Sequence, residues 1–131
     1  MLDHIEINVT DFARSKAFYR TALAPLGYDI RKELSKAAGF GVSEGHGKSM
    51  DPRRTEFWIA QGKPQEPRVH VAFSASSRSV VDAFFQAALA AGGRDNGKPG
   101  LRPQYHADYY GAFILDPDGY NIEAVCHRSE G

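Results

Sequence analysis

The sequence predicts an α+β domain built from two βαβββ modules, because it contains an internal repeat with the same local patterns in each copy. When the chain is shifted by 66 positions, residues 4–29 align with residues 70–95 without a gap and share eight identities. Each copy starts with alternating apolar and polar residues, typical of a strand, followed by an apolar stripe at helical spacing. Three shorter extended segments follow each helix. Side by side, two such modules would form a cupped mixed sheet around a pocket, with the helices on its outer face.

The first module, about residues 1–63, begins with a strand over residues 2–9. Its apolar residues are Ile5, Ile7 and Val9, and the opposite face carries His4, Glu6 and Asn8. Thr10-Asp11 offers an N-cap for a helix that we expect to end at Gly27. Three further strands are expected over Tyr28–Leu34, residues 39–42 and residues 55–60, with a mobile loop over residues 43–54 before the last of them.

The second module, about residues 68–128, follows a linker over residues 64–67 and repeats this order. Its first strand contains His70, and Ser76 or Ser77 caps a helix that ends at Gly92-Gly93. A weak, turn-rich strand is expected over residues 95–103, followed by strands over residues 109–115 and 120–126. Asp116-Pro117-Asp118-Gly119 joins the last two strands with the residues of a hairpin turn.

Length, charge and cysteine content restrict the class of protein. A chain of 131 residues is the size of one domain, here 1–131, and can bury a core without disulfides. Sixteen basic and sixteen acidic residues cancel, which argues against a nucleic acid or an anionic membrane as partner. No segment approaches the roughly 20 apolar residues of a membrane span. Cys126 is the one cysteine and no signal-like apolar run lies near Met1, so we expect a cytoplasmic protein. Its expected partner is a small molecule.

Four side chains on the polar strand faces are candidate metal ligands. His4 and His70 occupy the same position of the repeat, so both should face the groove between the modules. Glu123 is an acidic residue in the middle of a strand, where burial is unfavourable unless the carboxylate is paired or bound to a metal. Glu56 lies 67 positions before Glu123, one more than the 66-position offset that aligns the strands and helices of the repeat. It is the fourth candidate. Imidazole and carboxylate ligands suit Zn, Ni, Fe, Mn or Co rather than Ca or Mg.

Structural explanations compete with each of these assignments. A lone strand histidine is usually a hydrogen-bonded core or surface residue, and Trp58 faces the same way as Glu56 and could fill its place. Aromatic rings and an imidazole gather just before the penultimate strand, where they could line a ligand pocket or form an exposed or interface cluster. The candidate pocket residues are Glu6, Asn8, Trp58, His106, Tyr109 and Tyr110.

Three segments resemble the vicinal oxygen chelate superfamily, which includes glyoxalase I, extradiol dioxygenases, fosfomycin-resistance enzymes and bleomycin-binding proteins. They are Leu-Asp-His-Ile at 2–5, Val-His-Val-Ala-Phe at 69–73 and Phe-Ile-Leu-Asp-Pro-Asp-Gly-Tyr-Asn-Ile-Glu at 113–123. The resemblance covers nearly the whole chain, and the final hairpin is its most specific part. It implies a cupped sheet that holds a divalent metal, with the ligands His4, His70, Glu123 and Glu56.

The resemblance also implies a range of functions. The first is a metal-dependent glyoxalase-like lyase or isomerase that acts on a small substrate with vicinal oxygens, in which Glu123 or Glu56 is catalytic and moves a proton between adjacent carbons. An extradiol-type dioxygenase would use His4, His70 and Glu123 around Fe(II). A third possibility is a protein that binds a drug or metabolite without catalysis, since fold alone does not establish function. Such modules often pair between chains, so a homodimer is expected.

Overall fold

The structure, a computed structural model, describes residues 2–42 and 54–129 and confirms the two-module α+β fold. The expected loop over residues 43–54 lies outside the described residues except for Arg54. Each module runs strand, helix, strand, strand, strand, with a short 3₁₀ helix after the first α-helix. The elements of the first module are β1 (Ile5–Val9), α1 (Phe12–Ala22), η1 (Ala24–Leu26), β2 (Tyr28–Glu33), β3 (Ala37–Val42) and β4 (Phe57–Gln61). Those of the second are β5 (His70–Ser74), α2 (Arg78–Ala90), β6 (Arg94–Leu101), β7 (Tyr110–Leu115) and β8 (Asn121–Cys126).

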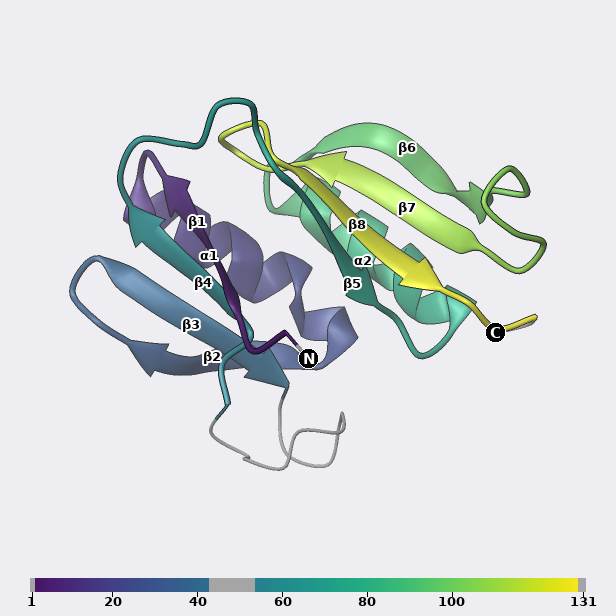
Figure 1. Cartoon of the computed structure of the whole chain (residues 1–131), viewed down its shortest axis with the longest axis horizontal. Helices are drawn as coiled ribbons and strands as arrows, with labels where there is room; N and C mark the ends of the chain where they lie inside the picture. Colours follow the sequence, from purple (N-terminus) through teal and green to yellow (C-terminus); the bar gives the residue numbers. More distant parts are fainter. Residues whose placement is uncertain (1, 43–53, 130–131) are drawn as a thin grey trace.

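The strands form two four-stranded sheets with the same topology, β1-β4-β3-β2 and β5-β8-β7-β6. In each sheet the first and last strands of the module pair in parallel, and the other pairs are antiparallel. The sheets stand side by side with β1 and β5 at their facing edges and both helices behind them (Figure 1). The two sheets are therefore not joined into one continuous sheet, because the described strands form hydrogen bonds only with strands of their own module.

Both helices begin at the predicted caps. The side chain of Asp11 accepts a hydrogen bond from the backbone of Arg14, and that of Ser77 accepts one from Val80. The first helix ends earlier than predicted, at Ala22, because the chain tightens into η1, which contains Pro25. Gly27 then caps η1 with a φ of 87°, a conformation that favours glycine.

The core lies between the sheets and the helices and continues across the two modules. Phe57 of β4 and Tyr28 of β2 each contact Phe73 of β5 edge-on, with ring centroids 5.3 Å apart. The hydroxyl of Tyr120 donates to the carbonyl of Asn8 at 2.6 Å and so ties the second module to β1. The two modules therefore share one packed interior.

The hairpin before β8 is held by a buried carboxylate. Asp116 is 1 % exposed and accepts hydrogen bonds from the backbone N–H groups of Asp118 and Tyr120 and from the hydroxyl of Tyr19. Burial raises the pKa of Asp116, and the bond from Tyr19 is the main opposing influence. This network fixes the start of β8, the strand that carries Glu123.

The strand boundaries correct two expectations. His4 and Glu56 were placed inside strands, but β1 begins at Ile5 and β4 at Phe57, so both residues precede their strands. None of the helices in the described part of the chain is long and apolar enough to cross a membrane.

Candidate functional site

The second module brings two of the predicted ligands together. His70 and Glu123 lie on adjacent parallel strands, and the register pairs His70 with Asn121 and Ala72 with Glu123. Because residues 121 and 123 face the same side of β8, Glu123 reaches diagonally towards His70. The Nε2 atom of His70 lies 2.9 Å from Oε1 of Glu123, and Glu123 is only 2 % exposed.

The orientation of His70 is set by two neighbours. Its Nδ1 lies 3.1 Å from the backbone carbonyl of Asn121, and this carbonyl, like the carboxylate of Glu123 beside Nε2, can only accept a hydrogen bond. Its ring stacks on Phe113, with centroids 6.0 Å apart, and the guanidinium of Arg102 covers that Phe113 ring at 5.4 Å. Both ring nitrogens of His70 therefore face acceptor oxygens, and its ring face is covered by Phe113.

Tyr109 holds the other oxygen of Glu123. Its hydroxyl donates a hydrogen bond to Oε2, and burial, followed by this contact with Glu123, raises the pKa of Tyr109. Gly111 of β7 lies beside the same contact, since a Cβ there would be 3.2 Å from Oε2. Sequence reasoning did not single out Gly111, although a glycine inside a strand often marks such a close approach.

These groups line a cavity of about 540 Å³ on the second sheet. Its walls are mainly aromatic and imidazole rings, and its lining residues are His70, Tyr105, His106, Tyr109, Phe113, Asn121, Glu123 and His127. The predicted pocket residues His106 and Tyr109 are among them. His127 was not predicted, because it follows the last strand in what reads as a polar tail.

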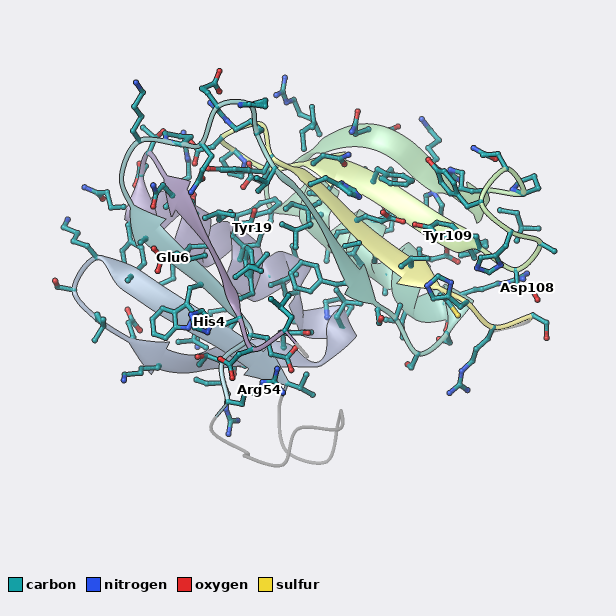
Figure 2. All side chains as sticks on the ribbon, in the orientation of Figure 1. His4, Glu6, Tyr19, Arg54, Asp108 and Tyr109 are labelled. Atoms are coloured by element: carbon teal, nitrogen blue, oxygen red, sulfur yellow. The ribbon has the colours of Figure 1, made fainter. Side chains whose placement is uncertain are left out.

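In the first module, His4 is oriented much as His70 is. Its Nδ1 lies 2.7 Å from the carboxylate of Asp3, which leaves Nε2 without a partner among the described residues. In Figure 2, His4 lies on the first sheet and Tyr109 on the second. The second ring nitrogen of a metal-binding histidine commonly donates to a carboxylate or a backbone carbonyl. Each histidine of the repeat therefore has its Nδ1 beside an acceptor oxygen.

Glu56 also has a tyrosine partner. The hydroxyl of Tyr28 donates to Oε2 of Glu56 at 2.8 Å. Burial is the main cause that raises the pKa of Tyr28, and this hydrogen bond is the next. Glu56 lines a larger cavity of about 800 Å³ between the starts of β1, β4 and the end of β5, together with Asp3, Arg54 and Phe73. Among the described residues, no three His, Cys, Asp or Glu side chains form a group that could hold a metal ion.

The sheet register corrects the proposed equivalence of Glu56 and Glu123. In the first module Ile5 pairs with Phe57, and at the matching repeat position Val71 pairs with Ile122. Trp58, rather than Glu56, therefore corresponds to Glu123. The indole N–H of Trp58 donates to Thr55 at 2.8 Å, and the ring packs against Gly39, where a Cβ would lie 2.7 Å from it.

The other predicted pocket residues are placed elsewhere. Glu6, Asn8 and Trp58 line neither of the two cavities. Tyr110 also lines neither, since its hydroxyl donates to Asp82 of α2 at 2.7 Å and its ring packs under Arg78. Figure 2 places Glu6 beside His4 on the first sheet.

Comparison with known proteins decides the family. The sequence model of the Glyoxalase/Bleomycin resistance protein/Dioxygenase superfamily matches residues 1–124. The chain belongs to this superfamily. None of the curated proteins matches it.

Solved structures of superfamily members have the same fold. A glyoxalase/bleomycin resistance protein from Albidiferax ferrireducens T118 is 28 % identical, with a TM-score of 0.77, over 98 % of this chain and 99 % of the other. A glyoxalase/bleomycin resistance protein/dioxygenase family enzyme from Burkholderia phytofirmans PsJN is 16 % identical, with a TM-score of 0.70, over 96 % and 98 %. The fosfomycin resistance protein FosX from Listeria monocytogenes is 21 % identical, with a TM-score of 0.68, over 96 % and 92 %.

Members of the superfamily are often metal-dependent, and the donor atoms of this chain fit such an ion in part. Two ligands bound at about 2.1 Å lie about 3 Å apart in octahedral geometry and about 3.4 Å apart in tetrahedral geometry. His70 Nε2 and Glu123 Oε1 lie 2.9 Å apart, which is close to the octahedral value and is also the length of a hydrogen bond. In one copy of the chain, the described residues offer this pair of donors to a single ion.

Proposed function

We propose that the protein is a divalent-metal-dependent lyase or isomerase of the glyoxalase type, with its site at His70 and Glu123. The observation that carries this proposal is the contact between Nε2 of His70 and Oε1 of Glu123 at 2.9 Å. In the tautomer that donates Nδ1–H to the carbonyl of Asn121, Nε2 would offer its lone pair beside the carboxylate of Glu123. A cation bound at that point would satisfy both acceptors.

The donor chemistry favours a transition metal as that cation. Imidazole nitrogen and carboxylate oxygen suit Zn, Ni, Fe, Mn or Co, and each donor here has the outer hydrogen bond that orients such ligands. A metal bound there would act as a Lewis acid on two neighbouring oxygens of the substrate. His70 and Glu123 would hold it in the second module.

We infer that the remaining ligands come from the first module of a second copy. His4 has its Nε2 unengaged among the described residues, and the carboxylate of Glu56 is oriented by Tyr28. These two residues do not join His70 and Glu123 within the described part of one chain. A homodimer that brings a first module against a second module would complete the set.

The residues of the chain itself would bind the substrate and move the proton. Glu123 would take a proton from a substrate carbon and return it to the adjacent one, while Tyr109 holds its second oxygen. The aromatic walls of the 540 Å³ cavity would pack against the substrate beside Glu123. Glu56, also bound by a tyrosine hydroxyl, is the alternative proton carrier.

One observation favours a second candidate, a binding protein without catalysis. Both oxygens of Glu123 already have partners, since His70 lies at Oε1 and Tyr109 donates to Oε2. If His70 carries a second proton, the imidazolium and the carboxylate form a complete ion pair that needs no metal. The cavity would then hold a drug or metabolite through its rings alone.

Metal content and activity of matched variants distinguish the two candidates. The untagged protein is purified, analysed for metals, stripped, and titrated with Zn, Ni, Co, Mn and Fe(II). It is then assayed with 1,2-dicarbonyl compounds in the presence and absence of a thiol. We expect about one metal per site in the wild type. His70→Ala and Glu123→Gln should each lower the metal affinity by more than the roughly 10–100-fold that is lost when only a hydrogen bond to a ligand is removed.

Glu33→Gln is the matched control, because Glu33 is exposed on β2 and pairs with Lys16. Its metal content should equal that of the wild type. If the wild type binds no metal tightly, or if His70→Ala retains full affinity, the metalloenzyme proposal fails and the binding protein remains.

A further inference from the structure

A pair of histidines forms part of the wall of the cavity that holds Glu123. Nε2 of His106 lies 2.8 Å from Nδ1 of His127, and the two rings stack with centroids 5.1 Å apart. Both residues are exposed, and both line the cavity with His70 and Glu123. The function proposed above makes no use of this pair.

Hydrogen bonding determines where the protons of the neutral pair lie. The backbone N–H of Asp108 donates to Nδ1 of His106 at 3.1 Å, and a backbone N–H cannot accept. His106 therefore carries its proton on Nε2 and donates it to Nδ1 of His127. His127 in turn carries its proton on Nε2, which has no partner among the described residues. The chain from Asp108 to His127 thus ends in one oriented, unused N–H donor.

The surrounding rings hold this donor in a fixed relation to Glu123. The ring of Tyr109 meets His106 edge-on at 5.5 Å and His127 edge-on at 5.3 Å. The hydroxyl of the same Tyr109 binds Glu123, and Tyr105 packs against Tyr109 at 4.8 Å. One tyrosine therefore links the histidine pair to the candidate proton carrier.

The same hydrogen bonds argue against a second metal site at this pair. A metal on Nε2 of His106 would move the ring proton to Nδ1, where it would face the N–H of Asp108. Two donors would then meet at hydrogen-bond distance, an arrangement that is unfavourable. The pair is built to donate to an oxygen rather than to bind a cation.

We propose that Nε2–H of His127 binds an anionic oxygen of the ligand in this cavity, and that His106 is a positioning residue for it. This inference rests on the proposed function, in which an enolate-like oxygen develops as Glu123 removes a proton. The flat walls formed by Tyr105, Tyr109 and Phe113 favour a planar, conjugated ligand. The ligand class is therefore a flat compound with an oxygen that is or becomes an anion.

The test uses 4-nitrocatechol, a flat compound with two adjacent hydroxyls whose visible absorption reports its ionisation. The metal-stripped and the metal-loaded protein are titrated with it at a pH where the free probe is mainly neutral. We expect the bound probe to absorb as its anion. His127→Ala should weaken binding about tenfold, as expected for loss of one hydrogen bond to a charged group, and should return the spectrum to that of the neutral probe.

Further variants separate this role from a structural one. His127→Gln retains an N–H donor and should restore part of both the affinity and the spectral shift. His106→Ala should weaken binding less than His127→Ala, and the double variant should bind no more weakly than His127→Ala alone. Arg128→Gln, next to His127, is the control for general positive charge and should stay within twofold of the wild type. Circular dichroism checks the fold of each variant.

The result that overturns the inference is binding by His127→Ala within twofold of the wild type with an unchanged spectrum, or no binding of the probe by the wild type. Metal content is measured on the same samples and should be equal in the wild type and His127→Ala. A wild type without metal whose probe binding still depends on His127 would contradict the proposed function and support this inference. A wild type that binds metal but whose probe binding does not depend on His127 would support the proposed function and contradict this inference.

Discussion

Replacing Tyr19 by phenylalanine removes one buried hydroxyl from the network that holds the β7–β8 hairpin. Tyr19 is fully buried, and its hydroxyl donates to the carboxylate of Asp116, which is 1 % exposed. A hydrogen bond to a charged group contributes about 1.5–3 kcal/mol, so we expect Tyr19→Phe to lower the free energy of unfolding by about 2 kcal/mol. With a urea dependence of about 1.5 kcal/mol per molar, the unfolding midpoint should fall by about 1.3 M.

The pH dependence of this loss provides a second check. Burial raises the pKa of Asp116 in the folded protein, although the hydroxyl of Tyr19 opposes that shift. The contribution of Asp116 to stability is therefore complete below its unfolded pKa of about 4 and is lost as the pH rises through the raised value. Because Tyr19 stabilises the ionised form, its removal should cost more at pH 7 than at pH 4.

Urea unfolding followed by the fluorescence of Trp58, at both pH values, measures these quantities. Tyr105→Phe is the control, because Tyr105 is 60 % exposed and its hydroxyl has no hydrogen-bond partner among the described residues. A loss below about 0.5 kcal/mol at pH 7, or a larger loss at pH 4 than at pH 7, would refute the reasoning.

Three other substitutions test further parts of the structure. Tyr109→Phe removes the donor to Oε2 of Glu123 and should weaken metal binding about 10–100-fold in calorimetric titration. Tyr110→Phe, which loses a hydrogen bond to Asp82, is the control and should not weaken it. Equal metal affinities of the two variants would contradict the role of Tyr109. Gly41→Ala would place a Cβ 2.1 Å from the backbone carbonyl of Arg54 and should lower the free energy of unfolding by about 1–3 kcal/mol or more. Gly100→Ala would place a Cβ 3.3 Å from the guanidinium of Arg102 and 4.0 Å from the carbonyl of Lys98 and should cost less; equal melting temperatures of the two variants would contradict this. Tyr120→Phe removes the hydroxyl that donates to the carbonyl of Asn8 and accepts from the backbone N–H of Gln65, and should lower the urea midpoint by an amount equivalent to about 1–3 kcal/mol; an unchanged midpoint would contradict a link between the modules at that point.

Much of the fold could be predicted because it follows from local patterns. Asp11 and Ser77 cap their helices as the sequence indicates, and the hairpin at residues 116–119 forms where proline and glycine allow it. The start of β4 was misplaced by two residues. Strand ends depend on pairing with neighbours rather than on local residue types, so patterns place them less well.

The candidate site was partly predictable for a similar reason. His70 and Glu123 were found because a repeated histidine and a mid-strand carboxylate are both unusual in sequence. The match of Glu56 to Glu123 was wrong, since the lengths of the intervening turns shift the register and place Trp58 there. His127 and Gly111 were missed because their roles arise only from tertiary contacts.

The most direct test of the central claim is the position of bound metal in crystals grown from Ni- or Zn-loaded protein. An anomalous difference map identifies the ion independently of any assumed ligand. We predict a peak within coordination distance of Nε2 of His70 and Oε1 of Glu123, with Nδ1 of His70 still bound to the carbonyl of Asn121. A map with no peak there, in which His70 and Glu123 remain in direct contact, would contradict it.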